Sequence, residues 1–341
     1  MRRKFRNTAI VICAVVVLLL SGLIILVTEP LLPTPKQPTP PVSPARLEAH
    51  VRTLSEQFFP RDFTHTSNLD RAAAYIREEF VHAKGAVSDQ SYQVTGFEPG
   101  LLDPKCVPVP HESSVNTYRN VIATFGPNTK ERIVVGAHYD ACGELPAADD
   151  NASGADGLIE LAYLLGRAQL PVRVDLVAFT LEEPPYFRTD NAGSAVHAKS
   201  LKKEGVPLRF MISLEMIGYF DDTPGSQKYP SPLMKLFYPS RRDFAVVVGS
   251  LDQALLVRRI KRLMREGTDL PIHSINAPGF IEGIDWSDHM YYWNEGYGAV
   301  MVGDTGNYGN SNYHRVADTP EKLDYKRMAK VVEGVYNAVS K

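Results

Sequence analysis

Short apolar segments alternate with amphipathic segments over most of the chain. Four of the apolar segments are almost continuously hydrophobic, as expected of strands that are buried on both faces of a sheet, and they cover residues 133–137, 172–179, 210–214 and 299–302. Between the first two, residues 152–167 carry apolar side chains at helical spacing, namely Leu158, Leu161, Ala162 and Leu165. The pattern therefore predicts strands separated by helices.

Further helices are predicted at both ends of this region. Residues 46–54 and 68–83 have helical periodicity, and a last helix begins after Asp324, a residue suited to cap its N-terminus. Strands that alternate with helices are typical of an α/β fold. We expect residues 46–341 to form a single domain with a mostly parallel, doubly wound mixed sheet flanked by helices.

The N-terminal segment differs from the rest of the chain. Residues 8–27 form a 20-residue run without a charged side chain, and a helix of that length spans roughly 30 Å, the thickness of a bilayer core. Residues 1–7 contain Arg2, Arg3, Lys4 and Arg6. This arrangement predicts one transmembrane signal-anchor helix in the cell (inner or plasma) membrane, with a cytoplasmic N-terminus and an extracytoplasmic domain.

A cleaved signal peptide is the alternative interpretation. The apolar run is longer than the roughly 7 to 15 residues usual for signal peptides, and no small-x-small cleavage site follows it. Residues 28–45 then form a linker with seven prolines between Pro30 and Pro44. Such a composition favours an extended polyproline II stalk that lifts the domain off the membrane.

The charge and the cysteine content exclude few classes of function. With 37 basic and 39 acidic residues the net charge is −2, so a nucleic-acid partner is not expected. Of the three cysteines, Cys13 lies in the apolar run. Cys106 and Cys142 are compatible either with one disulfide, if they lie outside the membrane and close together, or with two free thiols.

Polar groups follow each of the four predicted strands. His138 and Asp140 follow the first strand, Glu182 and Glu183 the second, Glu215 the third, and His314 comes a short distance after the fourth. A lone histidine or a pair of glutamates is usually structural or solvent-exposed. In open α/β sheets, however, the carboxyl ends of the strands meet at one edge, where ligands bind. The set therefore predicts a divalent metal site, with zinc the expected ion.

Six motifs in order connect these residues to a known family. They read HYD, ADDNASG, LEE, SLEMIG, SDH and NYHRVADT. Together they resemble the co-catalytic di-zinc aminopeptidases, which include bacterial leucyl aminopeptidases and aminopeptidase Y and belong to metallopeptidase clan MH. Glutamate carboxypeptidase II shares this framework. The resemblance covers about residues 46–338 and implies the zinc-exopeptidase fold, which is phosphorylase/hydrolase-like, with two zinc ions per chain.

The resemblance also implies a role for each matching residue. The implied metal ligands are His138, Asp150, Glu183, Glu215 and His314. Asp150 would bridge the two ions, His138 would bind one of them, and Glu183 with His314 would bind the other, whereas Asp149 is not expected to ligate. Glu182 would be the general base, and Asp140 would orient His138. Asp288 and Asp318 would support the ligands or contact the substrate.

The chain departs from the family pattern at two places. The family usually has Asp in the motif where this chain has Glu215, and we retain Glu215 as a ligand because a glutamate can also reach zinc. Residues 184–191, which follow the two glutamates, are longer than a plain turn and rich in rings. This segment either shapes the substrate pocket or is only a structural loop.

The expected function is that of a membrane-anchored, zinc-dependent exopeptidase. Aminopeptidase action on peptides is favoured, with a metal-activated water as nucleophile and Glu182 as the group that transfers its proton. The alternatives are a glutaminyl cyclase-like acyltransferase, which needs only one zinc, a carboxypeptidase, and a relative that binds without catalysis. A structural stalk protein does not account for the metal-ligand set. The preferred side chain and the oligomeric state are not specified by the sequence.

Overall fold

The computed structural model describes the chain except for residues 1, 31, 96–102 and 107–114. Eight strands form one sheet in the order β1-β2-β4-β3-β5-β8-β6-β7. The strands are β1 (Ala86–Val94), β2 (Asn116–Phe125), β3 (Arg132–His138), β4 (Arg173–Phe179), β5 (Leu208–Glu215), β6 (Ala245–Gly249), β7 (Ile272–Asn276) and β8 (Ala299–Gly303). The four strands predicted from the sequence are β3, β4, β5 and β8.

The sheet is mixed, as predicted, with a parallel centre. Strands β4, β3, β5 and β8 run parallel to one another, whereas at one edge β2 is antiparallel to β4 and β1 is antiparallel to β2. At the other edge, β6 is antiparallel to β8 and parallel to β7. The central parallel strands therefore all place their carboxyl ends at the same edge of the sheet.

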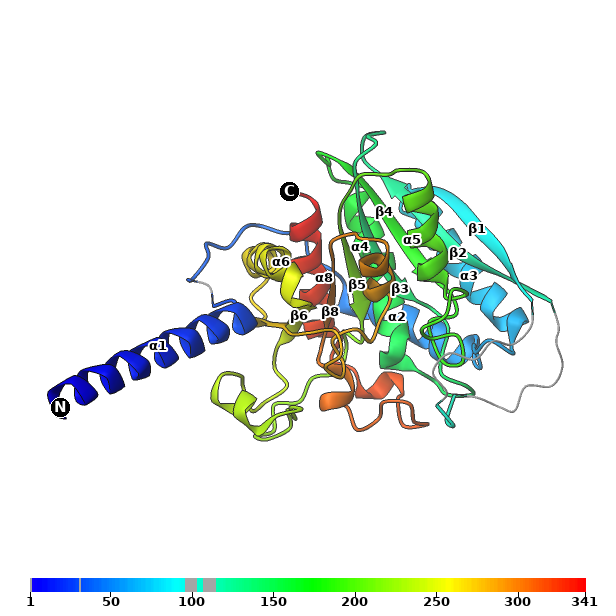
Figure 1. The fold of residues 1–341 in the computed structure, drawn as a ribbon. Helices are drawn as coiled ribbons and strands as arrows, with labels where there is room; N and C mark the ends of the chain where they lie inside the picture. Colours follow the sequence, from blue (N-terminus) through cyan, green and yellow to red (C-terminus); the bar gives the residue numbers. More distant parts are fainter. Residues whose placement is uncertain (1, 31, 96–102, 107–114) are drawn as a thin grey trace.

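Helices cover both faces of the sheet (Figure 1). One face packs against a large core that includes residues of α2, α3, α4, α6 and α8, and the other packs against α5 and α7. The helices are α2 (Pro44–Arg52), α3 (Thr66–His82), α4 (Gly154–Leu165), α5 (Gly193–Lys203), α6 (Ala254–Gly267), α7 (His289–Asn294) and α8 (Tyr325–Val339). Asp324 caps α8 as predicted, since its side chain accepts hydrogen bonds from Lys326 N and Arg327 N.

Short helical turns connect the longer elements. They are η1 (Thr53–Gln57), η2 (Ala148–Ser153), η3 (Pro232–Leu236), η4 (Leu251–Gln253), η5 (Gly306–Tyr308) and η6 (Pro320–Lys322). The turn η2 leads directly into α4, whose first residue is Gly154. A Cβ at Gly154 would lie 2.6 Å from the carbonyl oxygen of Leu214. The missing side chain therefore lets η2 lie directly against the end of β5.

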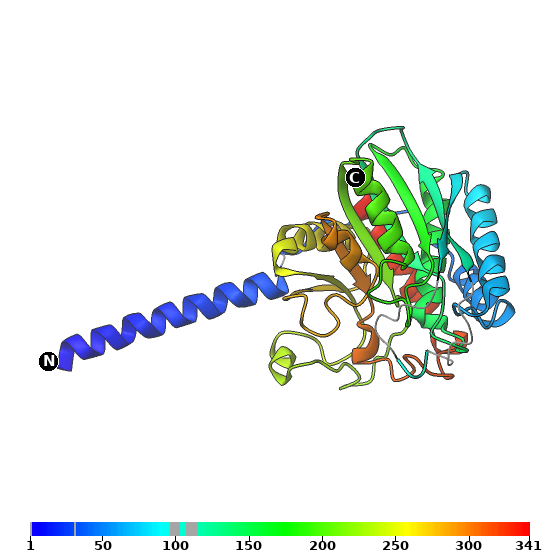
Figure 2. The ribbon, with the colours of Figure 1, turned by 45° about the vertical axis from the view of Figure 1, so that its right-hand side comes forward.

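The N-terminal residues form one continuous helix, α1 (Arg2–Thr28), which projects from the domain beside α6 (Figure 2). Its C-terminal carbonyls are capped by the domain, since Asn276 Nδ2 donates to Leu26 O (2.8 Å) and Lys261 Nζ donates to Thr28 O (2.9 Å). The predicted transmembrane helix is not supported by the structure. Within the described residues, none of the helices combines the length and apolar character needed to cross a membrane.

The proline-rich linker does not stand away from the domain as a free stalk. Lys36 Nζ donates to Arg265 O (2.9 Å), Gln37 N donates to Glu266 O (2.7 Å), and Thr39 Oγ1 donates to Gly267 O (2.8 Å). These acceptors are carbonyls in the last turn of α6, which have no partner within their own helix. The linker therefore packs along the domain because it satisfies the end of α6.

Candidate metal centre

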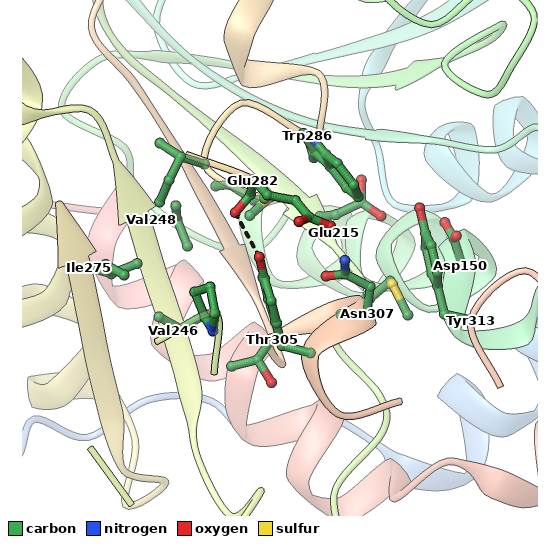
Figure 3. Close-up of a pocket in the computed structure, with 18 of the residues that line it drawn as sticks. Asp150, Glu215, Val246, Val248, Ile275, Glu282, Trp286, Thr305, Asn307 and Tyr313 are labelled. Atoms are coloured by element: carbon green, nitrogen blue, oxygen red, sulfur yellow. Dashed lines mark hydrogen bonds between the residues drawn. The ribbon is translucent and has the colours of Figure 1, made fainter. Parts of the chain in front are cut away.

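The strand ends border a cavity of about 380 Å³. Carboxylates, among them Asp150 and Glu215, lie at one end of this cavity, and apolar side chains such as Val246, Val248 and Ile275 lie at the other end (Figure 3). His138 ends β3, Glu215 ends β5, and Glu182 follows β4 closely. The structure therefore places these groups at the edge of the sheet where the central parallel strands end.

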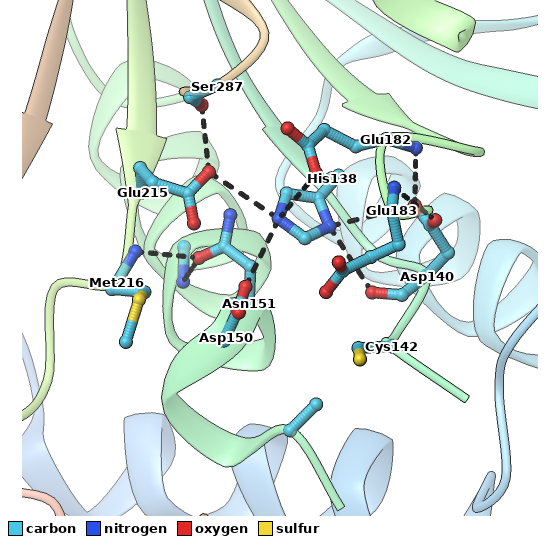
Figure 4. A network of polar contacts seen from close by, with 12 residues as sticks. His138, Asp140, Cys142, Asp150, Asn151, Glu182, Glu183, Glu215, Met216 and Ser287 are labelled. Atoms are coloured by element: carbon cyan, nitrogen blue, oxygen red, sulfur yellow. Dashed lines mark hydrogen bonds and ion pairs between the residues drawn. The ribbon is translucent and has the colours of Figure 1, made fainter. Parts of the chain in front are cut away.

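Two imidazoles define two adjacent groups of donor atoms. His138 Nε2 lies 3.5 Å from Asp150 Oδ1, 3.5 Å from Glu215 Oε2 and 3.8 Å from Glu182 Oε2 (Figure 4). His314 Nε2 lies 3.1 Å from Asp150 Oδ2 and 3.3 Å from Glu183 Oε2. Asp150 thus offers one carboxylate oxygen to each imidazole, which is the arrangement that a bridging ligand requires.

The donor atoms fit metal ions. His138 Nε2, His314 Nε2 and Glu183 Oε1 are buried and have no hydrogen-bond partner among the described residues. Buried polar atoms without partners are rare, and these three belong to two groups of possible metal donors, His138 with Asp150 and Glu215, and His314 with Glu183. The sulfurs of Cys106 and Cys142 lie beside the second group, but they are bonded to each other and are not free thiolates. Nitrogen and oxygen donors of this kind suit zinc, so the residues present match the ion that the sequence implies.

Burial and neighbouring charges shift the pKa values of the groups in this cluster. Burial, reinforced by neighbouring carboxylates, raises the pKa of Glu182 well above its usual value and those of Glu183 and Glu215 to about 7. Burial opposes the charged form of His314, but Glu183 and Asp150 outweigh it and raise the pKa of this imidazole to about 12. Without a cation, the cluster therefore keeps protons that a divalent ion would replace.

Asp140 lies on the Nδ1 side of His138, opposite the donor cluster. Its two carboxylate oxygens accept hydrogen bonds from Glu182 N (3.2 Å) and Glu183 N (3.1 Å). Oδ1 of Asp140 also lies 3.6 Å from His138 Nδ1. The same side chain therefore holds the glutamate pair and faces the nitrogen of His138 that points away from the cluster.

Asp318 and Asp149 hold the turn that carries Asp150. Asp318 accepts hydrogen bonds from Asp149 N (3.0 Å) and Asp150 N (3.1 Å). The carboxylate of Asp149 is engaged elsewhere, accepting from Gly218 N (3.0 Å) and Asn310 Nδ2 (2.7 Å). This agrees with the expectation that Asp149 does not ligate. Asp288 is fully buried but is not among the ion-pair partners of either imidazole.

The sequence reasoning missed two residues that contact the ligands. Ser287 Oγ donates to Glu215 Oε2 (2.8 Å), and the motif containing Ser287 could have indicated this contact. Asp103 Oδ2 lies 3.0 Å from His314 Nδ1, and no motif marked it. Cys106 and Cys142 form a disulfide, which selects one of the two states left open by the sequence.

The ring-rich segment at residues 184–191 shapes the cavity in part. Pro184 and Phe187 line it. Tyr186, by contrast, packs edge-on against Phe63, with 5.5 Å between the ring centroids, and belongs to the core. The two interpretations of this segment therefore apply to different residues within it.

Comparison with known proteins agrees with this geometry. Residues 120–339 match the model of Peptidase family M28. An uncharacterized protein, YfbL, of Escherichia coli K12 is 43% identical over 301 residues, which are 86% of each chain. A probable leucine aminopeptidase 1 of Trichophyton verrucosum is 23% identical over 312 residues, covering 86% of this chain and 77% of that protein.

Solved structures share the fold at low identity. A Bacteroides thetaiotaomicron glutaminyl cyclase bound to N-acetylhistamine and a leucine aminopeptidase precursor from the same species each superpose with a TM-score of 0.65 and 15% identity, covering 89% of this chain and 99% of theirs. A Zn-dependent exopeptidase from Parabacteroides distasonis has a TM-score of 0.62 and 18% identity, covering 89% and 100%. These similarities establish the fold.

The contacts of Glu215 lead to a prediction about metal binding. We expect Glu215→Ala to weaken zinc binding at the His138 group by at least about 10- to 100-fold, because a direct ligand should matter no less than its supporting residues. Glu215→Asp should recover part of the affinity. Metal analysis after dialysis against a weak chelator measures this, with Glu282→Gln, a change at an exposed glutamate, as control. Two tightly held zinc ions in Glu215→Ala would contradict the assignment.

Proposed function

The chain belongs to Peptidase family M28, and from this we propose that it is a two-zinc aminopeptidase that removes large apolar residues from the N-termini of peptides. Zinc metallopeptidase chemistry follows from the family and its zinc exopeptidase relatives. Three further points are our proposal: cleavage at the amino terminus of the peptide, a preference for apolar side chains, and two zinc ions per chain. The observation that carries the proposal is the distribution of charge along the cavity.

The donor geometry supports two metal positions. His138, Asp150 and Glu215 would hold one zinc ion, and His314, Asp150 and Glu183 would hold the other. Bound zinc supplies a water of lowered pKa and polarises the substrate carbonyl. Glu182 then acts as the proton carrier, accepting a proton at its carboxylate and donating it to the leaving amine. Its backbone is fixed for this role by the hydrogen bond from Glu182 N to Asp140.

The charges along the cavity favour the amino terminus of a peptide over its carboxyl terminus. Six carboxylates line the cavity, those of Asp103, Asp150, Glu182, Glu183, Glu215 and Glu282. Among the described lining residues, Lys228 is the only lysine or arginine, and it is exposed, with its Nζ donating to Gly225 O (2.9 Å). A carboxypeptidase needs a cation for the terminal carboxylate of its substrate, and the described lining offers only this exposed lysine, which favours action at the amino terminus.

The far end of the cavity suits a large apolar side chain. Val248 of β6 pairs with Ile275 of β7 on one side and with Met301 of β8 on the other, and all three line the cavity. Paired residues on adjacent strands point to the same face of a sheet, so they form a continuous apolar floor. Burial of a leucine or phenylalanine side chain there is worth roughly 1.5–3 kcal/mol.

Glutaminyl cyclase-like acyl transfer is the second candidate, and the fold similarity to a glutaminyl cyclase is the observation that favours it. That reaction needs one zinc ion and no hydrolytic water. The bridging position of Asp150, between two imidazoles, favours the two-metal hydrolase instead. An assay with a peptide that begins with glutamine distinguishes the two, because cyclisation and hydrolysis release different products.

The role of Glu182 gives a test of the mechanism. Glu182→Gln should lower kcat by roughly 10²- to 10⁴-fold while the bound zinc is retained, because the residue moves protons and does not ligate. Chelation should abolish the activity of the unaltered protein, and added zinc should restore it. Glu204→Gln, a change at an exposed glutamate at the end of α5 and outside the cavity lining, is the matched control. Full activity of Glu182→Gln would remove Glu182 from this role.

The apolar floor gives a test of specificity. Val248→Phe should fill the cavity and lower kcat/KM for a phenylalanyl reporter relative to an alanyl reporter by about 10-fold or more, because a bulky substrate side chain would no longer fit. Val316→Phe, at an exposed position, should leave the ratio unchanged. An unaltered ratio in Val248→Phe would show that the substrate side chain binds elsewhere.

We also propose that α1 tethers the domain to the outer face of the cell (inner or plasma) membrane. The support is the uncharged run at residues 8–27, the four basic residues before it, and the outward-facing apolar side chains of α1, such as Leu18 (70% exposed) and Leu19 (69% exposed). Protease added to cells with a permeabilised outer barrier and an intact inner membrane should then digest the domain. Protection until the inner membrane is lysed would contradict this orientation.

A further inference from the structure

The imidazole of His314 has two further contacts besides those that its Nε2 makes with the donor cluster. Its Nε2 faces Asp150 and Glu183, whereas its Nδ1 lies 3.0 Å from Asp103 Oδ2. Tyr313 stacks on the ring, with a centroid distance of 3.9 Å and an interplanar angle of 18°. Tyr313 therefore limits tilting of the ring, and Asp103 selects the rotation and the tautomer in which Nδ1 carries the proton and Nε2 offers its lone pair.

The two histidines obtain their supporting carboxylates in different ways. His138 has Asp140 two residues later in the chain, directly after β3. His314 has Asp318 four residues later, but both oxygens of Asp318 accept hydrogen bonds from Asp149 N and Asp150 N. The carboxylate that faces His314 Nδ1 comes instead from a position 211 residues earlier in the sequence.

The Cys106–Cys142 disulfide lies at the base of the turn that presents Asp103. Within this turn, Lys105 N donates to Asp103 Oδ1 (2.9 Å) and Cys106 N donates to Asp103 O (2.9 Å). Cys106 is fully buried and is bonded to Cys142, four residues after the end of β3. Lys105 O also packs so closely on Gly143 that a Cβ there would lie 2.9 Å away. The side chain of Asp103 is 25% exposed, and ion pairs in contact with solvent are weak on their own.

We propose that Asp103 is the positioning residue for His314 and that the Cys106–Cys142 disulfide keeps it in place, so that the metal position held by His314 and Glu183 depends on this bond. The proposal deepens the two-zinc assignment and rests on it. Cys106 Sγ lies 3.6 Å from His314 Nδ1, which is the nitrogen that faces away from the donor cluster. The disulfide therefore does not supply a ligand. It contacts the supported side of the ring directly, and it also holds the turn that presents Asp103.

Zinc affinity of the full chain tests the proposal. Competition with a chelator should show that Asp103→Ala weakens one of the two zinc ions by about 10- to 100-fold and leaves the other unchanged. Asp103→Asn, which keeps an oxygen acceptor but loses the charge, should fall in between. The double variant Cys106→Ser/Cys142→Ser should weaken the same ion. Glu144→Gln, at an exposed carboxylate just after Cys142, is the matched control and should bind both ions normally.

The metal-free protein provides a second measurement, which is independent of zinc. The hydrogen on Nδ1 of His314 should give the strongly deshielded signal of a hydrogen bond to a carboxylate in the unaltered protein and in Glu144→Gln. This signal should move upfield or disappear in Asp103→Ala and in the double cysteine variant. Absence of zinc binding by the unaltered protein would overturn the proposed function, while the ring signals would still test the pairing. Unchanged zinc affinity and unchanged His314 signals in Asp103→Ala would overturn the inference.

Discussion

The site depends on one electrostatic constraint, which is the burial of several carboxylates around Asp150. Asp150 lies between two imidazoles, and although burial opposes its charged form, the two facing rings hold its pKa below the usual value. Glu182, Glu183 and Glu215 crowd the same space, and their pKa values are raised. Such a group of buried anions is stable only with protons or cations to compensate it. The support from Asp140 and Asp318, which both accept backbone N–H groups, keeps the carboxylates converged despite their repulsion.

The central strands and most of the site residues could be predicted because burial on both faces leaves a clear signal. Strands β3, β4, β5 and β8 are apolar almost throughout, and parallel strands place the residues that follow them at one edge. His138 and Glu215 are the last residues of two of these strands, so their position in the fold follows almost directly from the sequence. The assignment of Asp150 as a shared ligand required the family resemblance, because acidic residues at the start of a helix can equally serve to cap its N-terminus.

The remaining features depend on contacts that no local pattern encodes. Strand β1 lies at the edge of the sheet, and most of its residues are exposed or half-buried, so it lacks the apolar run of a central strand. Asp103 meets His314 across 211 residues through a turn with no helical or strand periodicity. The prolines of the linker predict a freely extended segment. It packs on the domain instead because the last carbonyls of α6 need donors, a requirement that appears only once the fold is known.

The proposed function divides chemistry and substrate recognition between two parts of the mixed sheet. The donors His138, Glu183 and Glu215 end or follow β3, β4 and β5, in the parallel half of the sheet, whereas the apolar floor is formed by β6, β7 and β8, where one pairing is antiparallel. His314 comes after β8 and joins the donors from the other half. A change at a floor residue of β6 or β7 therefore alters the volume available to a side chain on strands that carry none of these donors. Glu215 is next to this division, since β5 pairs directly with β8. The hydrogen bond from Ser287 to Glu215 therefore holds a proposed ligand where the strand β5 meets the strands of the apolar floor. Ser287 itself lies in a segment outside the strands.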